Sequence, residues 1–374
     1  MVKKQHIGLG DIQDALREAG DPWEAGVTSL SALSFEEQKV RLGVVPPHGE
    51  LSIEEVAQRA LEMQSSIRAQ AIAAVSTPAA YDLRNVGGAN YVTPIKDQGS
   101  CGSCVAFGTT ATVESRLRLQ RGDPNLAIDL SEAHLFFCLG KSSGASCSNG
   151  WWPANAYDAY KSTGVTGEAC YPYASGLAKQ DCSGLCSNWA DSAIKITGYT
   201  TLTGQSAKIK DWISSGKGPV SACFVVYQDF FSYREGIYRH VSGSQAGGHC
   251  VTIIGYNDSP GYWICKNSWG TGWGSQGFFL IAYGECGIDT WQNHGVDAIE
   301  NTGWHNNAQV IGLWAINQDR NAWVYIQSLG WRKISPDNDN IFLDMLAQLA
   351  AAKAAGRPIN FYEDNGVIKQ IYVL

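Results

Sequence analysis

The chain has 374 residues, of which 44% are hydrophobic and 17% are charged, and its formal net charge is −7. This length suits two or three domains, and the composition allows a large buried core. The acidic balance argues against a nucleic-acid-binding surface. No stretch approaches the roughly 20 apolar residues of a membrane-spanning helix. The basic start MVKKQHIGLGD has no apolar segment after it and is not a signal peptide as it stands.

Residues 1 to about 77 form a leader without cysteine, which we expect to be mostly helical. The clearest helix is predicted over Leu51–Val75, where apolar residues recur at helical spacing. Ser52 and Glu55 form a candidate capping box at its start. Thr77 and Pro78 end the helical pattern and mark the boundary of the next domain.

Residues 78 to about 298 are rich in Gly, Trp, Tyr and Cys. The segment after Cys104 predicts a helix. Strands are predicted later, separated by Gly, Asp and Pro turns, over residues 219–226, 250–256, 262–269 and 277–283. Helices that precede strands indicate an α+β fold in two lobes.

All eleven cysteines lie between Cys101 and Cys286. This clustering predicts disulfides in the middle domain and therefore an oxidising location: secreted, periplasmic or lysosome-like. An odd count leaves at least one thiol unpaired. Cys223, Cys250 and Cys265 alternate with apolar neighbours in predicted strands, so we expect them to be buried thiols.

Residues 299–374 predict a small α+β module. Two hydrophobic segments, 310–316 and 322–329, are followed by a helix over Ile341–Ala355. A hairpin signal then centres on residues 364–366. Four tryptophans of this module suit either its core or a sugar- or peptide-binding face, and we favour the core. They are Trp304, Trp314, Trp323 and Trp331.

The segment QGSCGSC, residues 98–104, carries the first candidate for covalent chemistry. A cysteine in the first turn of a helix lies at the positive end of the helix dipole, which favours the nucleophilic thiolate. Gln98 can offer its side-chain amide to a developing oxyanion beside the Cys104 backbone N–H. The spacing of Cys101 and Cys104 also fits a disulfide, a redox dithiol or half of a zinc site.

Two later segments favour the nucleophile over these alternatives. His249 stands at the start of an apolar strand, after Gly247 and Gly248, and Asn267 follows in the segment YWICKNSWG. A Cys–His pair needs an oriented imidazole, and an Asn side chain can accept from the ring N–H without adding charge. A tryptophan beside that bond would shield it from water.

Over residues 78–290 the sequence resembles the papain-like cysteine peptidases. Besides the Cys, His and Asn segments, further motifs come in the order of that family. They are Tyr81-Asp82-Leu83-Arg84, Val92–Gln98, Leu130-Ser131-Glu132 before Cys138, Cys147-Ser148-Asn149-Gly150, Tyr171-Pro172-Tyr173 and Cys286-Gly287-Ile288.

The resemblance implies a role for each matching residue. Cys104 would be the nucleophile, His249 its base, Asn267 the residue that orients the base, and Gln98 the oxyanion side chain. Trp269 would cover the Asn–His bond, and Gly150 would hydrogen-bond extended substrate backbone. The resemblance also implies a disulfide Cys101–Cys147 and a disulfide between Cys138 and Cys182 or Cys186, with Cys170 a candidate for the remaining member of that set.

Three departures from the family pattern concern the substrate cleft. Val105 follows the nucleophile where the family has Trp. Gly248 precedes the histidine where a larger residue is common, which predicts an open wall of the substrate cleft. The stretch CSNGWWP carries one extra residue, so the position that binds substrate backbone lies at Gly150 or beside it.

The leader also resembles the family's propeptides over Leu30–Glu37. We therefore expect residues 1–77 to form an inhibitory, helical propeptide that runs through the cleft and is removed on activation. The alternative is a helical domain that stays attached. The C-terminal module suits substrate anchoring, binding of another partner, cleft regulation or stability.

The sequence thus predicts a zymogen of a cysteine endopeptidase that acts on protein or peptide substrates, with no metal or other cofactor and no nucleic-acid partner. No zinc signature or phosphate loop is present. Two alternatives use the same residues: a non-catalytic binding protein of the same fold, suggested by Val105, and an acyl transferase with the same Cys–His pair.

Overall fold

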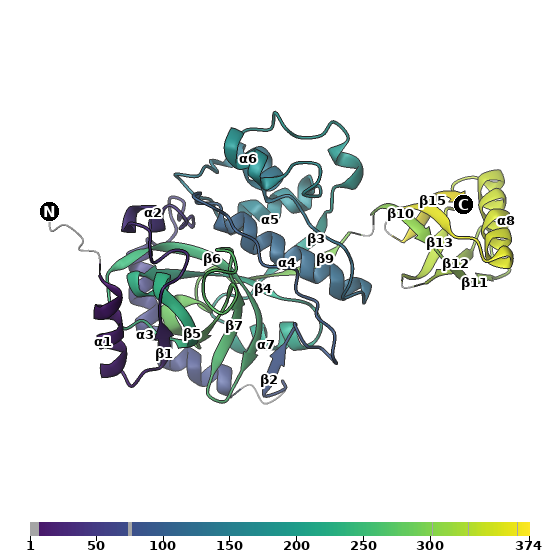
Figure 1. The fold of residues 1–374 in the computed structure, drawn as a ribbon. Coiled ribbons are helices and arrows are strands. Elements are labelled where there is room, and N and C mark those ends of the chain that lie inside the picture. The colour runs from purple at the N-terminus through teal and green to yellow at the C-terminus, as the bar shows by residue number, and fades with distance from the viewer. Residues whose placement is uncertain (1–6, 74–76, 301, 328, 365) are drawn as a thin grey trace.

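A computed structural model gives the structure of the protein. It describes residues 7–73, 77–300, 302–327, 329–364 and 366–374. Within these residues the strands form a nine-stranded sheet, in the order β1-β5-β8-β7-β6-β4-β9-β3 with β2 paired to β6, and a six-stranded sheet, in the order β10-β14-β15-β13-β12-β11. Figure 1 shows a two-lobed body that contains the first sheet and a separate module that contains the second. No helix in these ranges is both long and apolar enough to cross a membrane.

The leader contains helices but also a strand that was not predicted. Its elements are α1 (Leu9–Glu18), β1 (Trp23–Ala25), α2 (Phe35–Lys39) and α3 (Ile53–Ile72). The predicted capping box of α3 is present, since Ser52 and Glu55 each bond the other's backbone N–H. Strand β1 pairs antiparallel with β5. The expectation of a mostly helical leader is therefore incomplete, because a three-residue strand needs a partner that the local sequence does not reveal.

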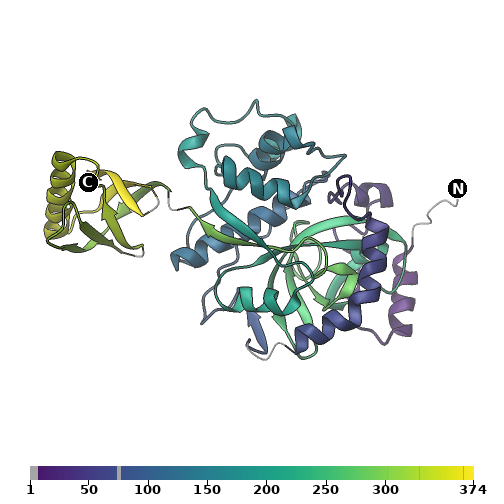
Figure 2. The same ribbon diagram turned by 180° about the vertical axis from the view of Figure 1, so that it is seen from behind.

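The middle domain divides into a helical lobe and a β-rich lobe, seen from behind in Figure 2. The predicted helix after Cys104 and the four predicted strands are all confirmed, with shifted ends. The helices are α4 (Cys104–Arg121), α5 (Pro153–Ser162), α6 (Tyr173–Lys179) and α7 (Ser206–Ser214). The strands are β2 (Ala80–Asp82), β3 (Ile196–Thr201), β4 (Val220–Tyr227), β5 (Tyr233–Tyr238), β6 (Gln245–Asn257), β7 (Tyr262–Lys266), β8 (Phe278–Ala282) and β9 (His294–Ile299).

Helix α4 is buried along most of its length between the two lobes. Its residues join a hydrophobic cluster with the helical lobe, whereas the other large cluster gathers in the β-rich lobe. Gly108 lets strand β6 approach the helix, because a Cβ there would lie 2.8 Å from Cys250 Sγ. This close packing fixes the start of α4 against the strand that carries His249.

Three disulfides hold the helical lobe together. They join Cys101 to Cys147, Cys138 to Cys182 and Cys170 to Cys186. The remaining cysteines are free and buried: Cys104, Cys223, Cys250, Cys265 and Cys286. Several disulfides in one domain are typical of proteins from an oxidising compartment.

The C-terminal module is a small α+β unit, as predicted. Its elements are β10 (Thr302–Ala308), β11 (Val310–Ala315), β12 (Ala322–Ile326), β13 (Gly330–Ile334), α8 (Asp339–Ala355), β14 (Ile359–Asp364) and β15 (Val367–Val373). The predicted hairpin joins β14 to β15, although its residue 365 lies outside the described residues. Helix α8 packs against one face of the sheet, where Val324, Ile326, Leu349 and Phe361 form the core.

The tryptophans of this module do not fill its core, so that preference was wrong. Trp304, Trp314 and Trp331 are 40%, 44% and 47% exposed. Alternation along the strands explains the outcome, because core residues Ala322, Val324 and Ile326 of β12 point to α8 and the intervening residues point to the open face. Aromatic pairs on that face include Trp304–Tyr372 and Tyr325–Trp331.

Candidate active site

Cys104 is the first residue of α4 and is completely buried. Its neighbours on the N-terminal side are held rigidly. Cys101 is tied to Cys147, and the Ser103 hydroxyl lies 2.6 Å from the Tyr173 hydroxyl. The thiol therefore sits at the positive end of a fixed helix, which stabilises a thiolate once water can reach it.

His249 and Asn267 form the second part of the site. Asn267 Oδ1 lies 2.8 Å from His249 Nε2, so the ring donates its Nε2–H to the amide oxygen. The other ring nitrogen, Nδ1, is buried and has no hydrogen-bond partner among the described residues. This tautomer leaves a lone pair on Nδ1, which is what a general base requires.

Trp269 covers the His249–Asn267 pair. Its ring lies 4.6 Å from the imidazole, centroid to centroid, and is 1% exposed. Phe231 stacks against it and Trp273 meets it edge-on. The aromatic cluster excludes water from the amide–imidazole bond and so keeps the ring in one orientation.

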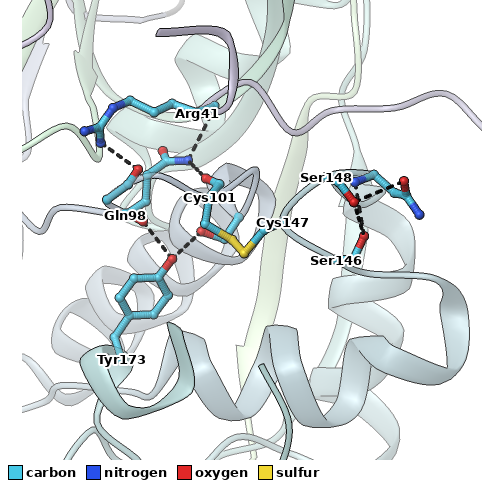
Figure 3. The surroundings of a disulfide bond; sticks show 10 residues. Arg41, Gln98, Cys101, Ser146, Cys147, Ser148 and Tyr173 are labelled. Carbon is cyan, nitrogen blue, oxygen red and sulfur yellow. Dashed lines mark hydrogen bonds between the residues drawn. A yellow bond between two sulfur atoms is a disulfide. The ribbon is translucent and has the colours of Figure 1, made fainter. Parts of the chain in front are cut away.

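Gln98 is held by hydrogen bonds on every side, as Figure 3 shows in part. Its Oε1 accepts from the Ser268 hydroxyl at 2.7 Å. Its Nε2 donates to the carbonyl oxygens of Cys101 at 2.7 Å and of Arg41 at 2.9 Å. Ser268 thus fixes which end of the amide faces the cleft, and the leader carbonyl of Arg41 occupies a donor that a substrate oxygen could use.

Leader residues 41–45 cross the site, where Val44 forms isolated β-bridges with Trp151 and Gly248. The Gly43 N–H donates to Cys104 Sγ at 3.3 Å. The Val44 N–H donates to the carbonyl of Gly248 at 3.1 Å, and the Trp151 N–H donates to the carbonyl of Gly43 at 2.7 Å. Two consecutive leader residues therefore bond both the thiol and the strand of His249.

Only a glycine fits at leader position 43. A Cβ there would lie 1.9 Å from the carbonyl oxygen of Gly102, far inside van der Waals contact. Gly150 permits the same approach from the other side, since a Cβ on it would lie 2.2 Å from the oxygen of Gly43. The leader backbone thus lies directly over the thiol without any side chain between them.

The covered site holds both reactive groups in their neutral forms. Burial raises the pKa of the Cys104 thiol to about 12. Burial also lowers the pKa of His249 to about 4, although its bond to Asn267 acts in the opposite direction. At neutral pH the covered pair is therefore a thiol and a neutral imidazole, without the thiolate needed for attack.

Comparison with known sequences assigns this geometry to a family. Residues 77–296, more than half of the chain, match the family described as papain family cysteine protease. The chain belongs to the papain family. It is 34% identical over 227 residues to the cathepsin B-like protein CP3 of Giardia intestinalis, covering 58% of this chain and 74% of that protein. It is 33% identical over 247 residues to a gut-specific cysteine proteinase of Caenorhabditis elegans, covering 59% and 74%.

Solved structures of papain-family precursors have the same fold. Procathepsin L2 from the larval midgut of Tenebrio molitor is similar over 77% of this chain and 88% of its own, with a TM-score of 0.59 and 27% identity. Together with the family match, this likeness makes the chain a cysteine endopeptidase in zymogen form and confirms the predicted two-lobed α+β fold.

The structure joins His249, Asn267 and Trp269 directly, and leader backbone links Cys104 and Gln98 to the same site, but one position of the papain-family cleft is moved. The backbone bonds to the leader belong to Trp151, one residue beyond Gly150, while the Gly150 N–H donates to Ser146. The extra residue in CSNGWWP accounts for this shift.

The wall at Gly248 is not open, contrary to the expectation from its missing side chain. A Cβ on Gly248 would lie 2.7 Å from Trp291 Cη2, so the tryptophan ring fills the space that the glycine leaves. Sequence reasoning missed Trp291, Trp151, Ser268 and Gly43. Of these, Ser268 had a visible signal, because it follows Asn267 directly and a hydroxyl is needed to orient a buried amide.

Proposed function

We propose that Cys104 is the nucleophile of this endopeptidase, that His249 is its general base and acid, and that Asn267 and Gln98 support them. The observation that carries the proposal is the single tautomer imposed by Asn267. It leaves His249 Nδ1 as a buried, unpartnered acceptor beside the strand that covers Cys104 Sγ.

The proposed reaction begins when the leader leaves the cleft. Water then reaches the thiol, and its proton moves from Sγ to Nδ1 of His249, giving a thiolate and an imidazolium. The thiolate attacks the substrate carbonyl carbon. The oxyanion receives N–H groups from Gln98 Nε2, freed from Arg41, and from the Cys104 backbone.

Collapse of the tetrahedral species breaks the C–N bond, and His249 gives its proton to the departing amine. A water molecule then loses a proton to His249 and attacks the acyl-cysteine. The carboxylic acid product leaves and the thiol is restored. Trp269 keeps water away from the Asn267 bond through both half-reactions, so that the ring does not rotate.

The test is titration of the reduced, processed protein with an epoxide thiol inhibitor, read by mass spectrometry and a fluorogenic dipeptide assay. We expect one adduct on Cys104 and a matching loss of hydrolysis, both absent in Cys104→Ala. Cys286→Ala is the matched control, because Cys286 is also free and buried. No adduct on Cys104 would favour a binding protein, and a product carrying an added amine would favour an acyl transferase.

We propose further that the leader, residues 1–77, is an inhibitory propeptide that is cut off on activation. The bonds of Gly43 to Cys104 and of Arg41 to Gln98 support this, because both catalytic groups are engaged by leader backbone. Incubation of the precursor at mildly acidic pH and sequencing of the new N-terminus test it. Full activity without any cut near residues 70–82 would overturn it.

For the C-terminal module, residues 299–374, we propose a role in anchoring the enzyme to its substrate. The open sheet face supports this, since Trp304, Trp314 and Trp331 are exposed on it, with Trp304 against Tyr372 and Trp331 against Tyr325. Deletion of residues 301–374 should lower hydrolysis of an insoluble protein and spare that of a soluble dipeptide. Equal loss on both substrates would favour a role in stability.

We propose that the enzyme works in a secreted, periplasmic or lysosome-like compartment. The three disulfides support an oxidising environment. Counting free thiols in protein taken from its native source tests this. Eleven free thiols in place of five would contradict it.

A further inference from the structure

Helix α8 packs against one face of the module's sheet, and the opposite face presents two groups of aromatic rings. Trp304, Tyr362 and Tyr372 form the first group, on β10, β14 and β15. The centroid of the Trp304 ring lies 5.4 Å from that of Tyr372, in a stacked arrangement, and 5.6 Å from that of Tyr362. Trp304 is 40% exposed and Tyr372 is 58% exposed, so these rings can contact a ligand.

The second group of rings lies on β11, β12 and β13, at the other end of the sheet. Tyr325 and Trp331 meet edge-on with their centroids 5.3 Å apart, and Trp314 is paired in register with Trp323. Neighbouring strands are roughly 4.8 Å apart, so the distance from Trp304 on one edge strand to Trp314 on the other is about 24 Å. The two groups together form an elongated platform, the aromatic face.

The charged residues of the aromatic face are balanced. Lys333 lies opposite Trp323, and Asp364 lies two positions beyond Tyr362 on the same strand, so their side chains are on the face of the rings. Their charges are opposite in sign. Gln370, opposite Tyr362, adds an uncharged amide. A nucleic acid or another polyanion needs a row of cations, which these residues do not supply. The aromatic face therefore suits an uncharged ligand.

A hollow of about 610 Å³ adjoins the first group of rings, between the module and the helical lobe. Aromatic rings and polar side chains line it from both sides: Trp304, Tyr362 and Asp364 of the module, and Trp189, Asp191 and Lys195 of the lobe. The volume is in the range of sites that bind small molecules. The aromatic face is therefore continued by a concave site of ligand size.

The lobe side of the hollow is held in place. The Trp189 ring lies 4.8 Å from that of His134, centroid to centroid. Lys195 Nζ donates to the carbonyl of Ser162 at 3.2 Å. The N–H of Glu300, at the start of the module, donates to the carbonyl of Lys195 at 2.8 Å. The segment that leads into the module is therefore bonded directly to the wall of the hollow.

A carbohydrate chain matches this combination of groups. One face of a pyranose ring presents C–H bonds, which pack against the electron-rich face of an aromatic ring. The sugar hydroxyls need hydrogen-bond partners. The carboxylates of Asp191 and Asp364 can accept from them, and the ammonium group of Lys195 can donate to them. The same carboxylates repel anionic polymers.

We propose that the aromatic face and the adjoining hollow bind an uncharged carbohydrate chain, so that the module anchors the protease to substrates that carry such glycans or lie among them. The inference rests on the anchoring role proposed for the module and names its ligand. Trp304 belongs to both the aromatic face and the hollow, whereas Trp331 belongs to the distant group of rings. These two residues therefore test the two ends of the site.

The first experiment measures retention of the full-length Cys104→Ala protein on cellulose, chitin, starch granules and insoluble mannan. We expect retention on at least one of them. Trp304→Ala and Trp331→Ala should each weaken it by about tenfold, because each removes the burial of one tryptophan ring. Leu343→Ala is the matched control, because Leu343 is an apolar residue of α8, 59% exposed, on the other side of the sheet. It should leave retention unchanged.

Three results of this experiment would overturn the inference. The first is a lack of retention on all four polysaccharides, and the second is unchanged retention of both tryptophan variants. The third is retention confined to an anionic polymer, tested with carboxymethyl-cellulose. A dimer in light scattering that Trp331→Ala converts to a monomer would also overturn it, because a second copy of the chain would then cover the aromatic face.

The second experiment separates the ligand from the anchoring role. Casein is coupled to the polysaccharide that retained the protein, or to polyacrylamide beads, and is digested with processed enzyme. Wild type should digest casein about tenfold faster on the polysaccharide, because anchoring raises the effective concentration of the enzyme. Trp304→Ala and Trp331→Ala should lose this advantage and keep kcat/KM on a soluble dipeptide.

The deletion of residues 301–374 tells the two possible failures apart. Equal digestion on both supports by wild type, with slower digestion of both after the deletion, would overturn the carbohydrate ligand and leave the anchoring role standing. An equal loss of dipeptide hydrolysis after the deletion would refute the anchoring role itself.

Discussion

The leader and the C-terminal module both flank the protease, but they relate to it in opposite ways. Apolar leader residues such as Ile12, Trp23 and Phe35 belong to the core of the β-rich lobe, and Val44 and Val56 belong to the core of the helical lobe. The core of the module, by contrast, draws only on residues of the module. The leader therefore completes the fold of the precursor, whereas the module is folded by its own contacts.

This difference indicates which flank controls catalysis. A segment whose structure depends on contacts with the protease can be held in the cleft and block it. A segment with its own core can be carried along without changing the site.

The largest effect is expected from Gly43→Val in the precursor. A Cβ at this position overlaps the carbonyl of Gly102, so the leader strand must leave the thiol. With the pKa of Cys104 falling from about 12 toward the ordinary value of about 8.5, alkylation at pH 7 should accelerate about a thousandfold. The rate is read from iodoacetamide labelling of Cys104. Gly10→Ala, in α1 with open space around it, should change nothing.

Two buried ion pairs allow the stability of the leader and that of the C-terminal module to be tested separately. Lys210 bonds Asp258 and the last turn of leader helix α3 at Ala71, and Arg332 of the module bonds Glu363 at 2.7 Å. Lys210→Met and Arg332→Met should each cost about 3 kcal/mol, because each leaves a carboxylate short of its partner. In calorimetry the first should shift only the transition of leader and protease, and the second only that of the module. A joint shift would show one cooperative unit.

Acid should lower the affinity of the leader for the protease, because His249 becomes protonated. Burial lowers the pKa of this histidine to about 4 in the precursor, so the covered site favours the neutral ring. The stabilisation of the covered site is complete above the ordinary pKa of about 6.5 and falls as pH drops toward 4.

The measurement is the affinity of the isolated leader for processed Cys104→Ala enzyme, in which no thiol titrates. It should fall by up to about a hundredfold between pH 6.5 and 4.5. His294 has a pKa lowered to about 4 by burial as well, but it lies away from the leader. His294→Gln should therefore keep the same pH profile, and a flat profile in Cys104→Ala would contradict the role of His249.

The smallest effect is expected at the far end of the leader. Gln64 of α3 donates to Glu285 of the protease at 2.7 Å. Gln64→Ala should weaken inhibition by the isolated leader about fivefold, which corresponds to about 1 kcal/mol, the net contribution of a typical hydrogen bond. Gln58→Ala, which removes an exposed bond within α3, is the control and should leave inhibition unchanged.

The sequence predicted the elements with periodic apolar residues and the motifs that follow one another in a known order along the chain. Helix α3 with its Ser52 cap, helix α4 and strands β4 and β6–β8 have periodic or alternating apolar residues, and the Cys, His and Asn segments lie in recognisable surroundings. The structure adds that leader residues Gly43 and Val44 bond both Cys104 and the strand of His249.

The features that were missed depend on partners distant in sequence. Strand β1 and leader residues 41–45 are too short for periodicity and are ordered by pairing with β5 and with Gly248. A glycine at position 248 does not reveal that the ring of Trp291, distant in sequence, occupies the space beside it. In the module, composition could not decide between core and surface for the tryptophans, because only the register of the sheet separates its two faces.

Release of the leader also removes β1 from the nine-stranded sheet and leaves β5 as a free edge. An edge strand offers unpaired backbone groups to any other strand, including one from a second molecule. Strand β5 is only six residues long and carries Arg234 and Glu235, both exposed, at its start. Charge and shortness discourage pairing between molecules, so the mature enzyme can lose its covering strand without becoming prone to aggregation.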